Sequence, residues 1–349
     1  WRRSAGRAGP ETEEIMEVTQ MGKLLEVKNL KVQFETSDGI VKALNGIDIS
    51  LDEGMTLGLV GETGAGKTTL AKSIMRIVPQ PPGKIVSGEI LYDGNDILKM
   101  DKNEIRKIRG QHISMIFQDP MTSLNPVMTV GDQIAETIKT HEKISAVEAT
   151  KKACEMLELV GIKADRAGDY PHQFSGGMKQ RVVIAIALAC NPKILIADEP
   201  TTALDVTIQA QVLEMMQNLK RKFNTATILI THDLGVVAQT CEKAAVIYAG
   251  EIVEYGTVHE VFKDMRHPYT IGLMNSIPKI HVDERRLHPI EGLMPDPMSL
   301  PEGCKFCDRC RFAIEKCKKE NPEMMKLGGE HSVRCFRADE NLKGGYGDE

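Results

Sequence analysis

Short apolar runs alternate with stretches of helical spacing along residues 24–255. The runs that we predict to be strands are 24–34, 46–51, 55–60, 89–92, 113–117, 194–197, 226–230, 244–248 and 251–255. Helical spacing covers 69–78, 130–161, 182–190 and 206–223. The run 55–60 (MTLGLV) is apolar throughout, as are strands buried inside a parallel sheet. This order predicts an α/β domain with a mainly parallel sheet, interrupted by a helical insert at about 119–190.

The pattern changes after residue 262. Prolines stand at positions 268, 278, 289, 295, 297, 301 and 322, and the apolar periodicity weakens. A small module with so little core needs a cross-link or a metal to hold it together. We therefore predict one domain over 21–262 and a second over 263–349. Residues 1–20 are expected to be a tag-like or disordered extension, with Met21 as the native beginning.

The composition narrows the classes of function. Of 349 residues, 42% are hydrophobic and 27% charged, which is ordinary for a globular protein. The net charge of −5 gives no indication of a nucleic-acid binder, so we expect no nucleic-acid partner. No apolar run approaches the roughly 18 residues of a membrane-spanning helix. We expect the chain to be cytoplasmic and to reach a membrane only through partner proteins.

A glycine-rich loop follows the apolar run 55–60 directly and fits the pattern G-x-x-x-x-G-K-[ST]. It consists of Gly61, Glu62, Thr63, Gly64, Ala65, Gly66, Lys67 and Thr68, with Thr69 next in the helix. In such a loop, successive backbone N–H groups turn inward and bind phosphates, helped by the positive end of the following helix. Lys67 supplies a positive charge to the β- and γ-phosphates. The Thr68 hydroxyl can ligate Mg²⁺. The loop predicts ATP binding.

Two acids close the apolar run 194–197. Asp198 stands where phosphate-loop ATPases hold Mg²⁺, and Glu199 stands where a carboxylate could polarise the attacking water. Gln118 and His232 each follow another predicted strand. By themselves they are as consistent with ordinary polar strand ends as with catalysis.

A second turn suited to an anion lies upstream of these acids. Ser175, Gly176 and Gly177 open the helix that continues through MKQR, and they can present backbone N–H groups to a phosphate held elsewhere. Together with residues 174 and 178–181 (FSGGMKQR), this turn resembles the signature motif of ATP-binding-cassette (ABC) ATPases.

The resemblance covers residues 24–337 and implies roles for further residues. It implies that Gln118 is the Q-loop glutamine that contacts Mg²⁺, that Asp198 is the magnesium acid, and that Glu199 is the catalytic base. It likewise implies a D-loop at 203–205 ending in Asp205, a γ-phosphate contact for His232 beside Lys67, and stacking of Phe34 on adenine. The implied fold is a RecA-like parallel sheet with an N-terminal antiparallel part and a helical subdomain.

The same resemblance implies partners. Two ABC domains meet head to tail, so each ATP lies between one phosphate loop and the partner's signature turn. We therefore expect a second ABC ATPase subunit, either a paralogue or a second copy.

Short patterns near the C-terminus resemble those of dipeptide and oligopeptide importer ATPases. They are 267–270 (HPYT), 276–278 (SIP) and 301–304 (PEGC), and Met178 in the signature matches the same group. This resemblance implies two membrane permeases, an external binding protein and a peripheral position on the cytoplasmic face of the membrane. Alternatives are an importer ATPase for nickel complexes or oligosaccharides and a soluble ABC ATPase without transport.

Five of the eight cysteines cluster in the C-terminal module: Cys304, Cys307, Cys310, Cys317 and Cys335. In a cytosolic chain such a cluster holds a metal or redox centre more often than disulfides. The spacing permits Zn²⁺, as in half a zinc knuckle, and also an iron–sulfur cluster. Resemblance to the peptide importers implies a [4Fe-4S] cluster on Cys304, Cys310, Cys317 and Cys335, with Cys307 as an extra thiol.

Overall fold

A computed structural model describes residues 23–202, 204–276, 290–340 and 342. Some predicted features lie outside these residues: the extension at 1–20, the start at Met21, Ala203 of the D-loop, and Ile277 and Pro278 of the SIP pattern.

The core of the molecule is an 8-stranded sheet with the order β11-β12-β10-β9-β3-β8-β7-β6. The strands from β9 to β6 run parallel to one another, and they are β9 (Lys243–Tyr248), β3 (Thr56–Val60), β8 (Ala226–Ile230), β7 (Ile194–Asp198) and β6 (Ile113–Ile116). Every residue of β3, β6, β7 and β8 is buried. Because both faces are covered, these strands are apolar runs without alternation, which is why the sequence predicted them well.

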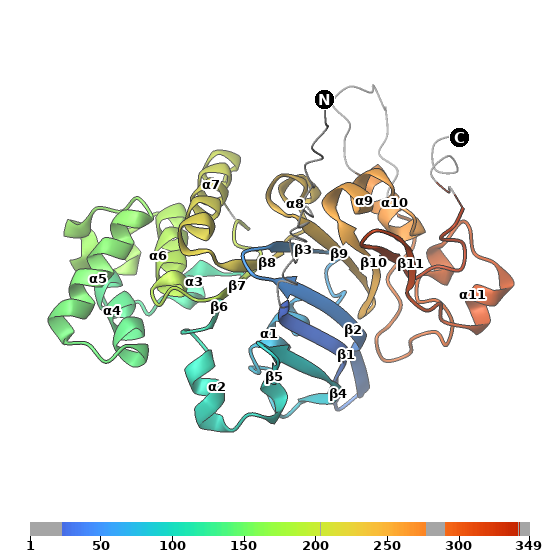
Figure 1. The fold of residues 1–349 in the computed structure, drawn as a ribbon, viewed down its shortest axis with the longest axis horizontal. Coiled ribbons are helices and arrows are strands. Elements are labelled where there is room, and N and C mark those ends of the chain that lie inside the picture. The colour runs from blue at the N-terminus through green and yellow to red at the C-terminus, as the bar shows by residue number, and fades with distance from the viewer. Residues whose placement is uncertain (1–22, 203, 277–289, 341, 343–349) are drawn as a thin grey trace, which may run out of the picture.

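A second, 4-stranded sheet lies beside the first, below it in Figure 1. It is antiparallel and has the order β2-β1-β4-β5, built from β1 (Lys23–Thr36), β2 (Gly39–Asp52), β4 (Gly83–Tyr92) and β5 (Asn95–Asp96). Strands β2 and β4 are longer than predicted, and the additional residues 39–45 and 83–88 include the exposed apolar side chains of Ile40 and Val86. A mainly parallel sheet beside an antiparallel one is the arrangement that the sequence analysis led us to expect.

The predicted helical insert is a separate group of helices at one end of the molecule (Figure 1). It contains α3 (Pro120–Ser123), α4 (Val130–His141), α5 (Ala146–Leu159) and α6 (Gly176–Leu188). The single helical stretch predicted at 130–161 is wrong, because the chain breaks it between His141 and Ala146. Ser145 begins the new helix with a capping box, in which its side chain and that of Glu148 cap each other's backbone N–H groups.

The other helices cover the sheets. They are α1 (Lys67–Ile74), α2 (Lys102–Ile108), α7 (Val206–Phe223), α8 (Leu234–Thr240) and α9 (Val258–Lys263). None of the helices in the described ranges combines the length and the apolar character that crossing a bilayer requires.

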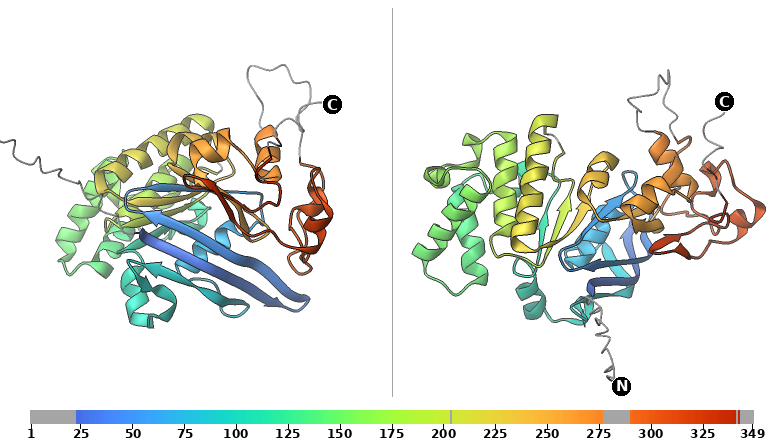
Figure 2. Two further views of the ribbon diagram at one scale, coloured as in Figure 1. Left: turned by 45° about the vertical axis from the view of Figure 1, so that its right-hand side comes forward. Right: turned by 45° about the horizontal axis from the view of Figure 1, so that its top comes forward.

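The C-terminal residues pack at the end opposite the helical insert, and both views of Figure 2 show this separation. They include α10 (Pro268–Asn275), α11 (Glu315–Lys319) and the hairpin β11 (Met325–Gly328) and β12 (His331–Val333). Strand β12 pairs with β10 (Glu251–Thr257), so the hairpin continues the large sheet. The domain boundary at 262/263 stays a prediction.

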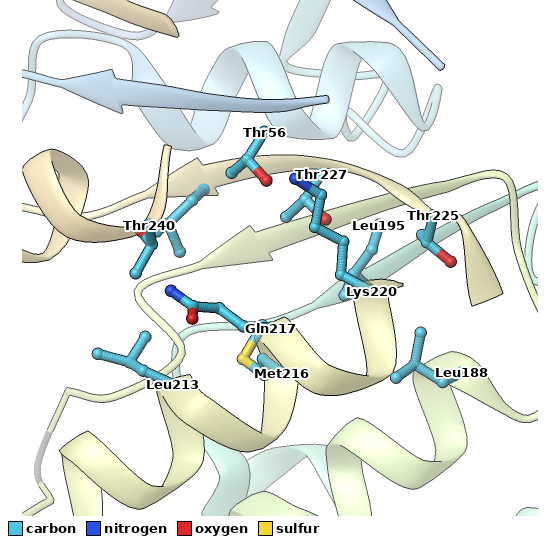
Figure 3. Close-up of a pocket in the computed structure, with 11 residues that line it drawn as sticks. Thr56, Leu188, Leu195, Leu213, Met216, Gln217, Lys220, Thr225, Thr227 and Thr240 are labelled. Carbon is cyan, nitrogen blue, oxygen red and sulfur yellow. The ribbon is translucent and has the colours of Figure 1, made fainter. Parts of the chain in front are cut away.

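A narrow gap remains between α7 and the sheet (Figure 3). Its volume is about 30 Å³, and its walls include Leu213, Met216 and Thr227. This space is about that of a single water molecule. It is a packing defect beneath a helix and too small for a nucleotide.

Candidate nucleotide-binding site

The predicted site residues gather at one edge of the large sheet. The glycine-rich loop follows β3, Gln118 follows β6, Asp198 ends β7 and His232 follows β8. These strands are parallel neighbours, so their carboxyl ends meet at the same edge. Open α/β sheets bind ligands at that edge.

The glycine-rich loop has a conformation that only glycine allows at two points. Gly66 has φ +109° and precedes α1, and a Cβ there would lie 2.8 Å from the Ala43 carbonyl oxygen. A Cβ on Gly61 would lie 2.2 Å from the Ile247 carbonyl oxygen. The loop therefore turns tightly against β2 and β9, in a path that side chains at these two positions would block.

The side chain of Lys67 folds back into the glycine-rich loop. Its ammonium group donates hydrogen bonds to the carbonyl oxygens of Gly61 and Glu62, at 2.6 Å and 2.9 Å. Burial lowers the pKa of Lys67, against the opposing effect of Glu199 and other nearby acids. The positive charge is thus fixed at the centre of the loop.

Thr68 and Asp198 form a pair beside Lys67. The hydroxyl of Thr68 hydrogen-bonds to the Asp198 carboxylate, which is buried at the end of β7. Burial raises the pKa of Asp198, and this hydrogen bond opposes the shift. A hydroxyl and a carboxylate side by side are oxygen ligands of the kind that Mg²⁺ takes in phosphate sites.

Glu199 is the centre of a polar group at the mouth of the site. Its carboxylate accepts hydrogen bonds from the Gln118 amide and the Thr202 hydroxyl, both at 2.9 Å. The imidazole Nδ1 of His232 lies 3.6 Å from the other carboxylate oxygen. This arrangement brings a carboxylate, an amide and an imidazole within reach of one water molecule.

These residues share a cavity of about 570 Å³. Its walls include Phe34, Thr63, Gly64, Gly66, Lys67, Thr68, Thr69, Gln118, Glu199 and His232. The partly buried ring of Phe34 lies at this wall, where the sequence predicted an adenine contact. The volume is that of a small-molecule or cofactor site.

Part of the wall comes from a segment that sequence reasoning missed. Met294, Pro295, Pro297 and Leu300 line the same cavity, and the Pro297 carbonyl accepts a hydrogen bond from the Lys42 N–H at 2.9 Å. Lys42, Val41 and Ala43 of β2 were missed as well. No local motif marks these residues, because they reach the site only through long-range packing.

The predicted signature turn has the expected local form. Ser175 caps α6 by accepting a hydrogen bond from the Met178 N–H, and Ser175 and Gly176 are exposed. Asp205 likewise caps α7. Among the described residues, neither Ser175–Gly177 nor Asp205 belongs to the wall of the cavity around the glycine-rich loop. The exposed turn is therefore available to a different molecule.

The five clustered cysteines line one pocket between α10 and the C-terminal segment. Backbone N–H groups of Phe306, Phe312 and Arg337 hydrogen-bond to the sulfur atoms of Cys304, Cys310 and Cys335. Such bonds are typical of metal-binding thiolates. The residue types fit a metal or cluster, yet no group of three or more potential ligands in the described ranges has metal-binding geometry.

Two family models match the chain. The ABC transporter model matches residues 44–202, and the model of the oligopeptide/dipeptide transporter C-terminal region matches residues 253–317. The first match covers the glycine-rich loop, the signature turn and the acids of β7. The second covers the segment with Arg309 and most of the clustered cysteines.

Curated relatives resemble the chain along most of its length. The oligopeptide transport ATP-binding protein OppD of Bacillus subtilis is 52% identical over 90% of this chain and 88% of its own. The dipeptide transport ATP-binding protein DppD of the same organism is 48% identical over 93% and 97%.

Solved ATP-binding cassettes share the fold. A dimeric cassette in a post-hydrolysis state with ADP and Pi matches with a TM-score of 0.61 and 28% identity, over 67% of this chain and 98% of its own. The cbiO1 protein of Clostridium perfringens, part of the ABC transporter complex cbiONQ, matches with a TM-score of 0.60 and 28% identity, over 72% and 95%.

Proposed function

Because the chain belongs to the ATP-binding subunits of oligopeptide and dipeptide ABC transporters, we propose that it hydrolyses ATP to power the import of di- or oligopeptides. The observation that carries this proposal is the single cavity shared by the glycine-rich loop, Gln118, Glu199 and His232. It combines phosphate donors with a carboxylate that can orient water.

We assign the chemical roles from this geometry. Backbone N–H groups of the glycine-rich loop other than that of Glu62, together with the ammonium of Lys67, would bind the phosphates, while Phe34 would stack on the base. Thr68, Asp198 and Gln118 would hold Mg²⁺, which would neutralise charge on the phosphates. Glu199 orients the attacking water, and His232 and Lys67 stabilise charge that develops on the γ-phosphate.

A second subunit completes the site. The exposed turn of Ser175, Gly176 and Gly177 opens α6 and can offer N–H groups to a nucleotide held by a partner's loop. Asp205 begins the next helix and would lie at the same interface. In this arrangement ATP binding closes the dimer of ATPase subunits, and hydrolysis opens it.

Substitution of the proposed base tests the assignment. Glu199→Gln should lower ATP turnover by about 10²-fold or more, because a general base contributes 10²–10⁴-fold. Nucleotide binding should persist, since the amide keeps the shape of the side chain. Glu89→Gln, at an exposed position of strand β4 in the antiparallel sheet, is the matched control and should leave turnover unchanged. Turnover in Glu199→Gln equal to that of the control would refute the role of Glu199.

Two membrane permeases and an external binding protein would complete the importer, with this subunit peripheral on the cytoplasmic face. Relatives named for oligopeptide and dipeptide transport support peptides as cargo. Co-purification of the tagged chain from its native membrane, followed by identification of the associated proteins and ligand, tests this directly. Recovery of the ATPase without any permease would favour a soluble ABC ATPase, and a nickel complex or oligosaccharide as ligand would replace peptides.

The cysteine pocket would hold a [4Fe-4S] cluster on Cys304, Cys310, Cys317 and Cys335, or alternatively Zn²⁺ on thiols of the five clustered cysteines. The shared pocket and the N–H groups directed at three of the sulfur atoms support this proposal. The bound group would cross-link a segment with little core. Protein purified without oxygen should contain iron and sulfide; zinc without sulfide would support the alternative, and neither metal would refute both.

A further inference from the structure

Glu62 is the second residue of the glycine-rich loop, and its side chain contacts the cysteine-rich segment. The guanidinium of Arg309 donates a hydrogen bond to the Glu62 carboxylate at 3.0 Å. Arg309 lies in the chain between Cys307 and Cys310, two of the residues that line the cysteine pocket. A residue 247 positions away in sequence therefore reaches the phosphate-binding loop.

The position of Arg309 is fixed by several contacts. Its side chain is only 6% exposed and donates further hydrogen bonds to the carbonyls of Ile290 and Glu291 and to the Tyr248 hydroxyl. A charge buried to this degree is retained in place only by well-formed partners. The guanidinium cannot follow Glu62 freely, so it determines where the Glu62 carboxylate lies.

The backbone of Glu62 is held by a second residue from the same region. The Tyr269 hydroxyl accepts a hydrogen bond from the Glu62 N–H at 2.9 Å. The Tyr269 ring is fully buried and packs on Phe306, with ring centroids 5.4 Å apart. Phe306 lines the cysteine pocket. Backbone and side chain of Glu62 are thus both tied to residues 304–310.

From Glu62 the connection continues to the phosphate site. The Glu62 carbonyl accepts a hydrogen bond from the ammonium of Lys67 at 2.9 Å. A displacement of Glu62 therefore changes the position of the charge that binds the β- and γ-phosphates.

We propose that Arg309 and Tyr269 are positioning residues that couple the cysteine pocket to the phosphate loop, so that the state of the pocket sets the affinity for nucleotide. The proposal rests on the nucleotide-binding function proposed above. Because coupling between two sites is reciprocal, bound nucleotide must also stabilise the cysteine pocket. The ligand of the regulated site would be a nucleoside triphosphate, and the regulator would be the cysteine-rich segment of the same chain.

Measuring nucleotide binding directly on the full chain, purified without oxygen, tests whether Arg309 and Tyr269 affect the affinity for nucleotide. Arg309→Met and Tyr269→Phe should each weaken binding of Mg·ATP by roughly fivefold, the low end of measured couplings. The matched controls are Arg311→Met, two residues further and 48% exposed, and Tyr255→Phe, whose hydroxyl contacts the Ser50 carbonyl. Both controls should bind as the unaltered chain does. Tyr269→Phe decides the question if Arg309→Met does not fold.

Thiol labelling tests the reciprocal half with a readout independent of activity. Labelling of the five clustered cysteines by a maleimide, followed by mass spectrometry, should slow when Mg·ATP is present. In Arg309→Met and Tyr269→Phe this dependence on nucleotide should disappear, whereas Arg311→Met should keep it. The coupling would be overturned if both variants bound Mg·ATP with unchanged affinity and if Mg·ATP did not change the rate of cysteine labelling in any of the proteins. Failure of the unaltered chain to bind ATP would instead refute the proposed function.

Discussion

Glu199 adopts the left-handed backbone conformation, with φ +48° at the end of β7. A residue with a Cβ rarely holds this conformation, and such strain collects at functional sites where the surrounding structure enforces it. Here the backbone N–H of Glu199 donates to the Ile230 carbonyl at 2.9 Å, and Gln118 and Thr202 hold the carboxylate. The proposed base is therefore oriented before any ligand arrives.

Gly66 allows a residue-scale test of the phosphate loop. Gly66→Ala places a side chain at φ +109° and 2.8 Å from the Ala43 carbonyl, so the loop must move. We expect loss of ATP binding and a fall in the free energy of unfolding of about 2 kcal/mol or more.

Gly94→Ala is the control for that experiment. Its φ is +74°, but no atom lies within 4 Å of the added Cβ. The strain alone should cost about 1–2 kcal/mol and leave ATP binding intact. ATP titration and urea unfolding of both variants give the comparison; unchanged ATP binding in Gly66→Ala would contradict the described loop conformation.

At the scale of elements, the sequence predicted the parts of the fold that local chemistry decides. Buried parallel strands are apolar runs, and the loop after β3 carries its own pattern, so both were found. The break between α4 and α5 was missed although Ser145 and Glu148 form the S-x-x-E signal of a capping box. That signal was outweighed by continuous helical composition on either side.

Long-range contacts could not be predicted in the same way. Met294 and Pro297 enter the nucleotide cavity, and Arg309 and Tyr269 reach Glu62, only because the C-terminal segment folds back over the loop. Nothing in the local sequence of these residues indicates their partners. The predicted role of Glu62 was limited to its place in the loop pattern.

Helix α10 provides a test at the scale of an element, through pH. His267 caps this helix, its Nδ1 accepting from the Tyr269 N–H at 3.1 Å. Burial, and then the nearby charge of Arg334, lowers the pKa of His267 to about 3. Between about pH 6.5 and 3, the unfolded chain binds a proton that the folded chain refuses. The free energy of unfolding therefore falls as the pH falls, by at most about 1.4 kcal/mol per pH unit from this residue.

His267→Asn isolates that contribution. Asparagine can accept the same capping hydrogen bond but does not titrate. We expect lower stability at neutral pH, because the smaller side chain leaves space against Phe306, and a flatter dependence on pH between 6.5 and 4. Urea unfolding across this range measures both effects. An unchanged slope would mean that His267 is not the group responsible.

At the scale of the whole molecule, the nucleotide site lies between the helical group and the cysteine-rich segment. The helical group with the exposed signature turn stands at one end, and the cysteine-rich segment at the other (Figure 2). In the proposed dimer the first would contact the partner's nucleotide, while the second contacts the chain's own phosphate loop through Glu62. In this proposal, ATP binding would affect both the contact with the partner subunit and the C-terminal segment.

We propose that ATP hydrolysis at Glu199 powers peptide import. Uptake of labelled peptides into vesicles that contain the complete complex, purified from its native membrane, tests this proposal most directly. We expect ATP-dependent uptake with the unaltered chain and with Glu89→Gln, and uptake lowered by about 10²-fold with Glu199→Gln. Peptide uptake by the Glu199→Gln complex at the rate of the Glu89→Gln complex would contradict it.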